Sequence, residues 1–235
     1  MKQKGHKHPL SQTIESIVEV LDRMGFELDL GTEIDTEENN FDLLNVPKDH
    51  PARDMQDTFF IKDIDGKLPR TQTSAHQVPY MREKVAKGEV PFRMFSYGRV
   101  FRNEATDATH ETSFFQVEGL AVAEKGQITL GHLKWTLENF LRGVLGDGVK
   151  IRLRPGYFPF VEPGVEVDVF FGGCWVEMLG AGMVHPKVLE NGGLDPQKYA
   201  GFAFGIGIDR LMLARHGIND IRLSYQGDLR FVNQF

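Results

Sequence analysis

Apolar residues recur every three or four positions in two long stretches, a spacing typical of helices with one buried side. The first stretch covers residues 10–24, where Ser11 or Thr13 is expected to cap the helix and Gly25 to end it. The second covers residues 130–145 and carries leucine, phenylalanine and valine on one side. These stretches therefore predict two amphipathic helices.

Weaker helical patterns occur in three other places. Residues 73–87 open with Thr73 and Ser74, either of which favours a helix N-terminus. Residues 209–216 precede a glycine that would stop a helix, and a short helix is expected around residues 39–44. Helices are therefore expected near both ends of the chain and between them.

Between the helices, apolar and polar residues alternate, as they do in strands with one buried face. The clearest cases are residues 92–103 and 114–123, two antiparallel strands joined by a long polar loop. Shorter strands are predicted at residues 26–30, 58–62, 67–70, 149–154, 165–171, 174–179 and 200–208. The order of elements predicts one α+β domain over residues 1–235, with a mainly antiparallel sheet flanked by helices.

Two glycine-containing turns favour hairpins. Asp65-Gly66 is expected to fold the strand at residues 58–62 back onto the strand that follows it. Gly172-Gly173 is expected to do the same for the strand at residues 165–171.

Composition excludes several classes of protein. The 235 residues carry a net charge of −6, so a broad basic field for nucleic acid is excluded, although a local basic patch is compatible with this charge. The one cysteine excludes an internal disulfide and fits a reducing cytoplasm. No apolar run reaches the length of a membrane span, and the N-terminus lacks the apolar segment of a signal peptide.

Two polar pairs frame the loop between the clearest strands. Arg102 and Glu104 lie two residues apart, and so do Gln116 and Glu118. Residues two apart on a strand share a face, so pairing of the strands would bring the four side chains together. Because a guanidinium binds anions and a carboxylate accepts hydrogen bonds from amines, the patch suits a ligand with both groups. The alternative is a solvated face with cross-strand ion pairs.

The sequence GFAFGIGIDRLMLARHG at residues 201–217 combines a glycine-rich strand with the start of a helix. Glycines in a strand often mark the close approach of a ligand or of another backbone. Arg210 stands in the first helical turn, where a cation opposes the helix dipole unless an anion binds there. The alternative is a helix packed through small residues, with Arg210 in solvent.

Other candidate residues have simpler interpretations. His6 and His8 are too few for a metal site at this end of the chain. Cys174 follows a glycine turn and has no histidine and aspartate constellation that would make it a nucleophile. His185 is expected to bond within its own loop.

Together these segments resemble motifs two and three of class II aminoacyl-tRNA synthetases. The strand–loop–strand from FRNE to FFQVEG is similar to motif two, and GIGIDRLML is similar to motif three. The resemblance extends to the alpha subunits of bacterial phenylalanyl-tRNA synthetases, through segments that occur in the same order: HPLSQTI, NFDLLNVPKDHPARDMQDTF, RTQTS, GRVFRNEATDATHE, RPGYFPFVEPGVEVDV, LGAGMVHPKVL, GFAFGIGIDRL and DLRFVNQF. Alpha subunits of that family carry an N-terminal coiled-coil arm, which this sequence is expected to lack.

The resemblance implies an ATP site with Mg²⁺ as a second cofactor. The implied ATP-binding residues are Arg102 on the α-phosphate, Glu104 and Phe114 at the adenine, His110 in the loop, and Arg210 on the γ-phosphate. Arg102 and Arg210 are then the catalytic cations, and Glu162 is the carboxylate linked to magnesium. Nearby Glu166 and Asp168 share a strand face, where pairing with arginine or solvation is favoured over a structural metal.

The resemblance also implies a phenylalanine pocket beside the nucleotide. Its implied residues are Ser74, Gln77, Gln116 and Glu118 on the ammonium and carboxylate, Phe158 and Phe160 on the phenyl ring, and Val161, Gly180, Gly182, Ala203 and Gly205 as walls and floor. Such a pocket would disfavour a hydroxylated ring, because the hydroxyl would lack a hydrogen-bond partner.

The implied activity is that of a class II synthetase in the cytoplasm. Phenylalanine would react with ATP to give phenylalanyl-adenylate, and the aminoacyl group would pass to tRNA(Phe). The implied partner is a separate beta subunit in an (αβ)2 assembly, or a second copy bound through the helix at residues 10–24. An alternative is a paralogue that activates or senses an aromatic amino acid without charging tRNA.

The sequence departs from the family's pattern at several positions, the last of which lie in regions expected to contact the partner subunit. Asp209 stands where glutamate is expected, and Phe115 stands where histidine is common. Residues 223–227, LSYQG, replace a more usual acidic and phenylalanine-rich sequence. These departures leave adenylate formation as the expected reaction.

Overall fold

A computed structural model describes residues 5, 7–54, 57–171 and 173–235. The strands are β1 Glu27–Leu28, β2 Ile34–Thr36, β3 Lys67–Pro69, β4 Phe92–Phe101, β5 Ser113–Glu124, β6 Lys150–Phe158, β7 Val161–Phe171, β8 Cys174–Val184 and β9 Tyr199–Gly207. The α-helices are α1 Pro9–Arg23, α2 Glu37–Asn40, α3 Gln77–Lys87, α4 Leu130–Leu145, α5 Pro186–Asn191, α6 Ile208–His216 and α7 Leu229–Val232. Short 3-10 helices are η1 Asp42–Leu44, η2 Pro51–Arg53, η3 Thr73–His76 and η4 Ile221–Ser224.

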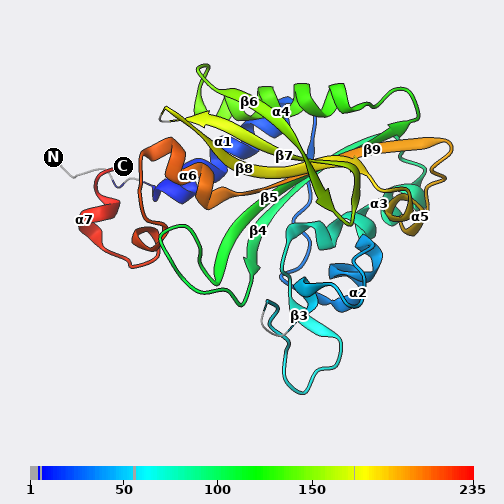
Figure 1. Cartoon of the computed structure of the whole chain (residues 1–235), viewed down its shortest axis with the longest axis horizontal. Helices are drawn as coiled ribbons and strands as arrows, with labels where there is room; N and C mark the ends of the chain where they lie inside the picture. Colours follow the sequence, from blue (N-terminus) through cyan, green and yellow to red (C-terminus); the bar gives the residue numbers. More distant parts are fainter. Residues whose placement is uncertain (1–4, 6, 55–56, 172) are drawn as a thin grey trace.

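A seven-stranded sheet organises the molecule, in the order β1-β4-β5-β9-β8-β7-β6 (Figure 1). Strands β1 and β4 run parallel, and the other neighbours in this sheet are antiparallel. β2 and β3 form a separate two-stranded ribbon. The predicted α+β class with a mainly antiparallel sheet is therefore confirmed.

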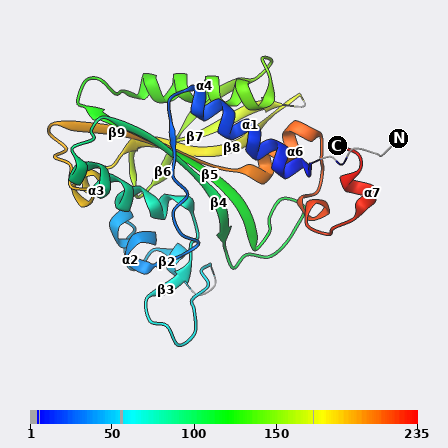
Figure 2. The ribbon, with the colours of Figure 1, turned by 180° about the vertical axis from the view of Figure 1, so that it is seen from behind.

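The two faces of the sheet pack against different helices. Helices α1 and α4 cross one face (Figure 2), and Phe140 of α4 contacts Phe204 of β9 with ring centroids 5.7 Å apart. A second core contains Leu120 of β5, which points away from that face, packed with Phe41 and Tyr80. No helix in the described part of the chain is long and apolar enough to cross a membrane.

The strongest sequence patterns are confirmed. The helix predicted at residues 130–145 has those bounds, because one side of α4 is buried and Thr129 caps its first turn by accepting a hydrogen bond from His132 N. β4 and β5 pair antiparallel, and β9 lies beside β5. β7 and β8 form the predicted hairpin with longer strands than expected, and Gly172 of its turn lies outside the described residues.

Two predicted helix caps are wrong. His8 caps α1 instead of Ser11 or Thr13, and its Nδ1 accepts a hydrogen bond from Leu10 N at 3.1 Å. The helix expected from residue 73 begins with η3, and α3 follows it without a side-chain cap. In both cases the chain enters the helix earlier, or more tightly wound, than residue preference alone indicates.

The strand predicted at residues 58–62 is also wrong. This segment has no regular structure, and Phe59 and Phe60 are exposed. The predicted strand after it does exist as β3, but its partner strand is β2, and the preceding segment meets it through a hydrogen bond from Ile61 N to Lys67 O at 3.1 Å. Pairing with a segment about thirty residues away cannot be read from local alternation.

Candidate functional site

The predicted polar residues meet on one face of the central strands. Gln116 and Glu118 of β5 lie opposite Gly98 and Ser96 of β4 on one side. On the other side Glu118 lies opposite Gly205 of β9. Between them on β5, Val117 is fully buried in the core on the opposite face, as the alternation predicts.

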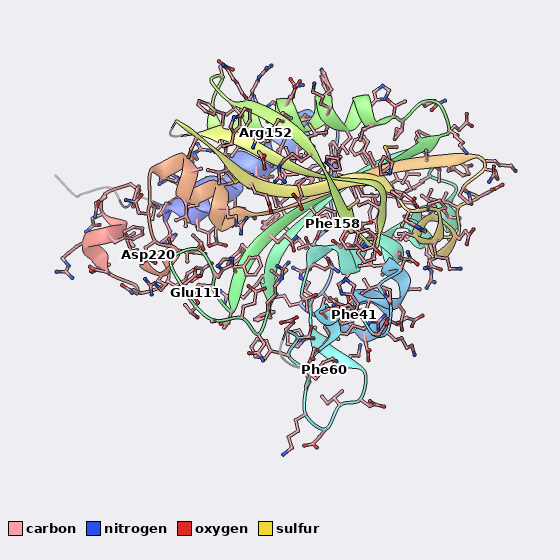
Figure 3. The ribbon with its side chains drawn as sticks, viewed as in Figure 1. Phe41, Phe60, Glu111, Arg152, Phe158 and Asp220 are labelled. Carbon is pink, nitrogen blue, oxygen red and sulfur yellow. The ribbon has the colours of Figure 1, made fainter. Side chains whose placement is uncertain are left out.

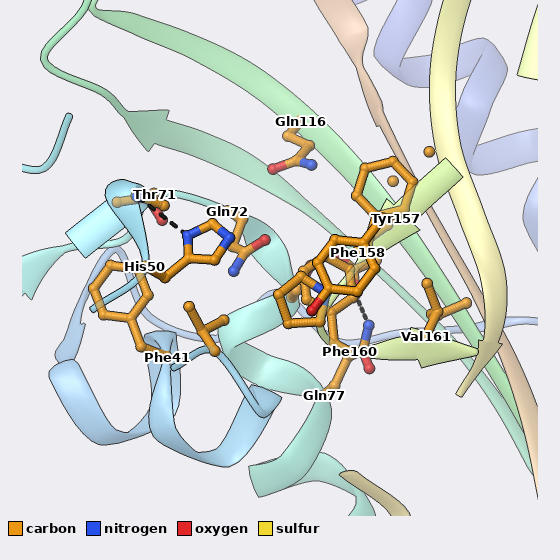
Figure 4. Close-up of a pocket in the computed structure, with 18 of the residues that line it drawn as sticks. Phe41, His50, Thr71, Gln72, Gln77, Gln116, Tyr157, Phe158, Phe160 and Val161 are labelled. Carbon is orange, nitrogen blue, oxygen red and sulfur yellow. Dashed lines mark hydrogen bonds between the residues drawn. The ribbon is translucent and has the colours of Figure 1, made fainter. Parts of the chain in front are cut away.

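A cavity of about 670 Å³ opens over this face (Figure 4). It is bounded by twelve of the predicted residues: Ser74, Gln77, Arg102, Glu104, Gln116, Glu118, Phe158, Phe160, Val161, Gly180, Ala203 and Gly205. Gly205 helps to keep this space open, because a Cβ there would come within 3.0 Å of Gln116 Nε2. The volume is in the range of sites that enclose small organic ligands.

Glu118 is a buried acid at the base of the cavity, with only 2% of its surface exposed. The Ser74 hydroxyl and Gln77 Nε2 both donate hydrogen bonds to its carboxylate. Burial raises the pKa of Glu118 to about 7, against the lowering effect of these bonds and of the nearby Arg70 charge. An ammonium group bound here would give this carboxylate a positively charged hydrogen-bond partner inside the cavity.

The aromatic wall comes from the turn between β6 and β7. The rings of Phe158 and Phe160 stack with centroids 6.1 Å apart, and both line the cavity (Figure 4). Asn45 Nδ2 holds this turn by donating to Pro159 O at 2.8 Å. Gly180 lies under the Phe158 ring, where a Cβ would approach the ring carbons to 2.7 Å. The wall therefore requires glycine at position 180.

A smaller cavity of about 250 Å³ adjoins the first. It shares Arg102, Glu104, Gln116, Gly180 and Gly205 with the larger cavity and adds the remaining predicted nucleotide residues, which are His110, Phe114 and Arg210. Arg102 and Arg210 thus line one cavity, although Arg102 lies in the β4–β5 loop and Arg210 lies in α6.

Arg102 is held in place by neighbours on several sides. Its Nε donates to Thr71 O at 3.2 Å, and its guanidinium lies 5.2 Å from the centroid of the Phe114 ring. Glu104 Oε1 is 3.9 Å from Nη1, a loose ion pair with more than a third of each side chain exposed. Burial, together with the positive charge of Arg210, lowers the pKa of Arg102, while Glu104 opposes this shift. Such crowding of like charges favours a site that receives an anion.

Arg210 lies in the first turn of α6, directly after β9. Gly207 caps this helix without a side-chain hydrogen bond. Arg210 Nη1 donates to Glu177 O at 3.3 Å across the cavity. The N-terminus of α6 and Arg210 therefore present positive charge to the same space, which suits phosphate groups.

His110 lies in the β4–β5 loop at the edge of this space. Asp107 organises the loop, because its carboxylate accepts hydrogen bonds from Thr109 N and His110 N at 2.7 and 2.8 Å. These bonds and the His110 ring hold the pKa of Asp107 well below its usual range. The loop turns His110 into the smaller cavity.

Two predicted site residues lie apart from both cavities. Gly182 packs under Val161, where a Cβ would meet the Val161 side chain at 2.7 Å. Glu162 keeps 73% of its side chain exposed and pairs with His185 Nε2 at 3.4 Å. The described residues contain no group of three or more metal-ligating side chains. Glu162 therefore does not fit a magnesium site in this cavity.

The remaining candidates have structural roles. Asp168 accepts hydrogen bonds from Arg152 Nε and Arg154 Nε at 2.7 and 2.8 Å, which with the Glu166–Arg154 pair confirms the expected arginine pairing. The Arg154 and Arg152 bonds lower the pKa of Asp168 to about 2.

The expectation that His185 bonds within its own loop is also confirmed, because His185 Nδ1 accepts a hydrogen bond from Lys187 N at 3.0 Å. Cys174 is exposed. His6 lies outside the described residues.

Part of the larger cavity comes from a region to which sequence reasoning assigned no site residue. Phe41, Val46, His50 and Pro51 line it, together with Tyr157 beside the aromatic wall (Figure 4). The first four belong to irregular loops and short helices, where no periodic pattern marks which side chains point inward, and Tyr157 lies near the end of β6. The signal in the sequence was the similarity of the segment NFDLLNVPKDHPARDMQDTF to the family. That segment contains Phe41, Val46, His50 and Pro51.

The family comparison agrees with this geometry. The whole chain, residues 1–235, matches the family model described as tRNA synthetases class II core domain (F). It is 50% identical over 246 residues to the phenylalanine--tRNA ligase alpha subunit of Leptospira biflexa, across 100% of this chain and 70% of that relative. This chain belongs to the phenylalanine--tRNA ligase alpha subunit family. The family member from Enterococcus faecalis is 49% identical over 245 residues, across 99% of this chain and 69% of its own length.

The fold has counterparts among more distant synthetases. A pyrrolysyl tRNA synthetase from Desulfitobacterium hafniense superposes with a TM-score of 0.74, covering 93% of this chain and 73% of that one. The two sequences are 19% identical, so this likeness concerns the class II synthetase fold alone. The sheet with its flanking helices is therefore a scaffold that this family shares with other synthetases.

Proposed function

We propose that this chain is the catalytic core of a phenylalanine--tRNA ligase: it activates phenylalanine with ATP and transfers it to tRNA(Phe). The observation that carries the proposal is the arrangement of two joined cavities, one lined by Glu118 and the Phe158–Phe160 wall and the other by Arg102 and Arg210. We call these the amino-acid half and the nucleotide half. The proposal treats residues 1–235 as a single catalytic domain.

In the amino-acid half, buried polar groups would hold the backbone of phenylalanine. Glu118 would accept hydrogen bonds from the ammonium group, with Ser74 and Gln77 fixing the carboxylate that receives them. Phe158 and Phe160 would pack on the phenyl ring above the small side chains of the floor. A phenolic hydroxyl would add a polar group against an aromatic wall, which favours phenylalanine over tyrosine.

In the nucleotide half, the arginines would bind the triphosphate. The proposed assignments are Arg102 on the α-phosphate, Arg210 on the γ-phosphate, His110 near the outer phosphates, and Phe114 with Glu104 at the adenine. The carboxylate oxygen of phenylalanine would attack the α-phosphorus, and the bond to the bridging oxygen would break to release pyrophosphate. Because the protein forms no covalent bond in this step, positioning and cationic stabilisation supply the acceleration.

The second step would use the tRNA as the attacking group. A hydroxyl of its terminal ribose would attack the carbonyl carbon of the adenylate, and AMP would leave. The proposed partners are tRNA(Phe) and a separate beta subunit in an (αβ)2 assembly, or a second copy through α1. Magnesium is proposed only as the companion of ATP, and the proposed setting is the cytoplasm.

The test is phenylalanine-dependent exchange of pyrophosphate into ATP, with and without a beta subunit from the same source. We expect exchange with phenylalanine and about 100-fold less with tyrosine. Arg210→Ala should remove most of the exchange without unfolding the protein. Binding of phenylalanine in calorimetry with no exchange under any of these conditions would overturn the proposal and favour an amino-acid sensor.

A further inference from the structure

The segment at residues 220–225, which we call the C-terminal strap, contacts two separate parts of the nucleotide half. Its helix η4 packs near α6, and Ser224 Oγ lies 3.7 Å from Met212 Sδ. At its start, Ile221 N donates to Ala108 O in the β4–β5 loop at 2.9 Å. In Figure 3, Glu111 marks that loop and Asp220 marks the strap.

The other end of the strap reaches a buried carboxylate. Tyr225 Oη donates a hydrogen bond to Asp209 Oδ1 at 2.6 Å. The second oxygen, Asp209 Oδ2, accepts a hydrogen bond from Phe115 N at 2.7 Å. Asp209 has 1% of its surface exposed, so these bonds replace the water that its carboxylate would otherwise bind.

The charges around Asp209 determine how these bonds are made. Burial raises the pKa of Asp209, while Tyr225, Phe115 N and the positive charge of Arg99 act to lower it. Burial and the adjacent carboxylate raise the pKa of Tyr225, so its hydroxyl keeps its proton and remains the donor. The strap is therefore tied to α6 by a hydrogen bond from the Tyr225 hydroxyl to the Asp209 carboxyl group.

This carboxylate stands at the junction of three segments that do not adjoin in sequence. Asp209 immediately precedes Arg210, and Phe115 immediately follows Phe114. The Asp209 side chain thus connects α6, one residue before Arg210, with β5, one residue after Phe114. A small shift of this carboxylate would move both groups relative to each other.

We propose that the Tyr225–Asp209 pair is a positioning device for the nucleotide half, setting the distance between Arg210 and Phe114. Tyr225 lines neither cavity, and Asp209 lines the smaller one with its two carboxylate oxygens bonded to Tyr225 and Phe115. This inference rests on the proposed function in that it takes ATP as the ligand of the smaller cavity. The amino-acid half is independent of the pair, because Glu118 is held by Ser74 and Gln77.

The experiment compares Tyr225→Phe with the unmodified chain and with Tyr199→Phe as a matched control. Tyr199 lies at the start of β9 and packs against the second core. Tyr225→Phe should raise KM for ATP about tenfold in pyrophosphate exchange and change KM for phenylalanine by less than about twofold. Tyr199→Phe should change neither constant.

A double-mutant cycle keeps the test decisive if one variant is less stable. Asp209→Asn removes the charge that accepts both bonds, so it should weaken ATP binding more than Tyr225→Phe does. The double variant should lose less ATP affinity than the sum of the two single losses, because both changes weaken the same interaction. Thermal unfolding of each variant separates this loss from a loss of folded protein.

The outcomes distinguish this inference from the proposed function. Equal increases in both KM values, additive losses in the cycle, or an unchanged KM for ATP in Tyr225→Phe would each overturn the positioning role. If the unmodified chain binds ATP but does not exchange pyrophosphate with phenylalanine, the proposed function fails, and ATP affinity measured by calorimetry still tests the pair. If the unmodified chain binds no ATP, the positioning role is overturned as well.

Discussion

The acid of the amino-acid half lies on a strand paired on both sides, whereas the two arginines of the nucleotide half lie on a loop and at a helix end. Glu118 and Gly205 face each other across paired strands, and Ser74 and Gln77 bond directly to the acid between them. In the nucleotide half, by contrast, a loop, a helix end and the C-terminal strap must all be in place.

The two halves of the site differ in burial and in rigidity. Glu118 is almost inaccessible, while Arg102 keeps 38% of its side chain exposed. Residues on paired strands are placed by the sheet itself, whereas residues on a loop depend on a few hydrogen bonds. The amino-acid half is therefore preorganised, and the nucleotide half is the part whose geometry a distant substitution can change.

The largest expected effect comes from removing the cation at the centre of the nucleotide half. Arg102→Ala should lower kcat/KM for pyrophosphate exchange about 1000-fold, because charge stabilisation at the α-phosphate is lost. Binding of phenylalanine, measured by calorimetry, should change by less than about threefold. Arg23→Ala, at an exposed arginine of α1, is the matched control and should be silent. A comparable loss of phenylalanine binding would break the division into halves.

A smaller effect is expected from neutralising the acid of the amino-acid half. Glu118→Gln should raise KM for phenylalanine about 50-fold and leave KM for ATP nearly unchanged, since the ammonium loses its charged partner. In the unmodified protein, KM for phenylalanine should fall as pH rises through about 7, where the carboxylate forms. The variant should lose this pH dependence, and its persistence would contradict the assignment.

Ionisation of Glu118 is expected to favour phenylalanine binding but to lower the stability of the ligand-free protein. The pKa of Glu118 is raised from 4.5 to about 7 in the folded protein, so the fold holds this proton more tightly than the unfolded chain does. Ionisation between about pH 4.5 and about pH 7 therefore lowers the stability of the ligand-free protein. Glu118→Gln should raise the thermal unfolding temperature at pH 8 while it impairs catalysis, as scanning calorimetry can measure.

A further change addresses the shape of the amino-acid half. Gly180→Ala would place a methyl group within 2.7 Å of the Phe158 ring, which must then move into the pocket. We expect about a tenfold increase in KM for phenylalanine with a smaller change in KM for ATP. Gly131→Ala, at a helical glycine with more room, is the control. Equal changes for both substrates would show that the wall is shared rather than specific.

The smallest expected effect lies in the loop at the edge of the nucleotide half. His110→Ala should raise KM for ATP about threefold, because an exposed loop side chain contributes little to binding. Thr109→Ala, next to it, tests whether the loop's internal bonds matter instead. A loss as large as that of Arg102→Ala would place His110 among the principal phosphate ligands.

The sequence predicted the elements with strong periodicity, and with them much of the site. Gln116 and Glu118 fall on one face because alternation on β5 is regular, and the residues between them are core. The β9 glycines were predicted to mark a close approach, and Gly205 faces the site as expected. The similarity of short motifs supplied residues such as Phe158, which no local pattern would select.

The parts that could not be predicted depend on contacts between distant residues. The segment at residues 58–62 has strand-forming side chains, yet β3 finds its partner in β2. Glu162 follows the aromatic turn in sequence, but its exposed carboxylate pairs with His185 outside both cavities. The sequence also singled out Asp209, Phe115 and the segment around Tyr225 as departures from the family pattern without indicating that they bond to one another.

In the proposed site, strand β5 would supply Phe114 to one substrate and Gln116 and Glu118 to the other, with core residues interleaved between them. A shift of this strand by one residue would turn every binding group inward and every core group outward. Efforts to retune the specificity of such a catalyst for a new amino acid therefore have little freedom on β5 itself. The tolerant positions are those on the neighbouring strands and turns, where a change alters one substrate's surroundings and leaves the shared strand untouched.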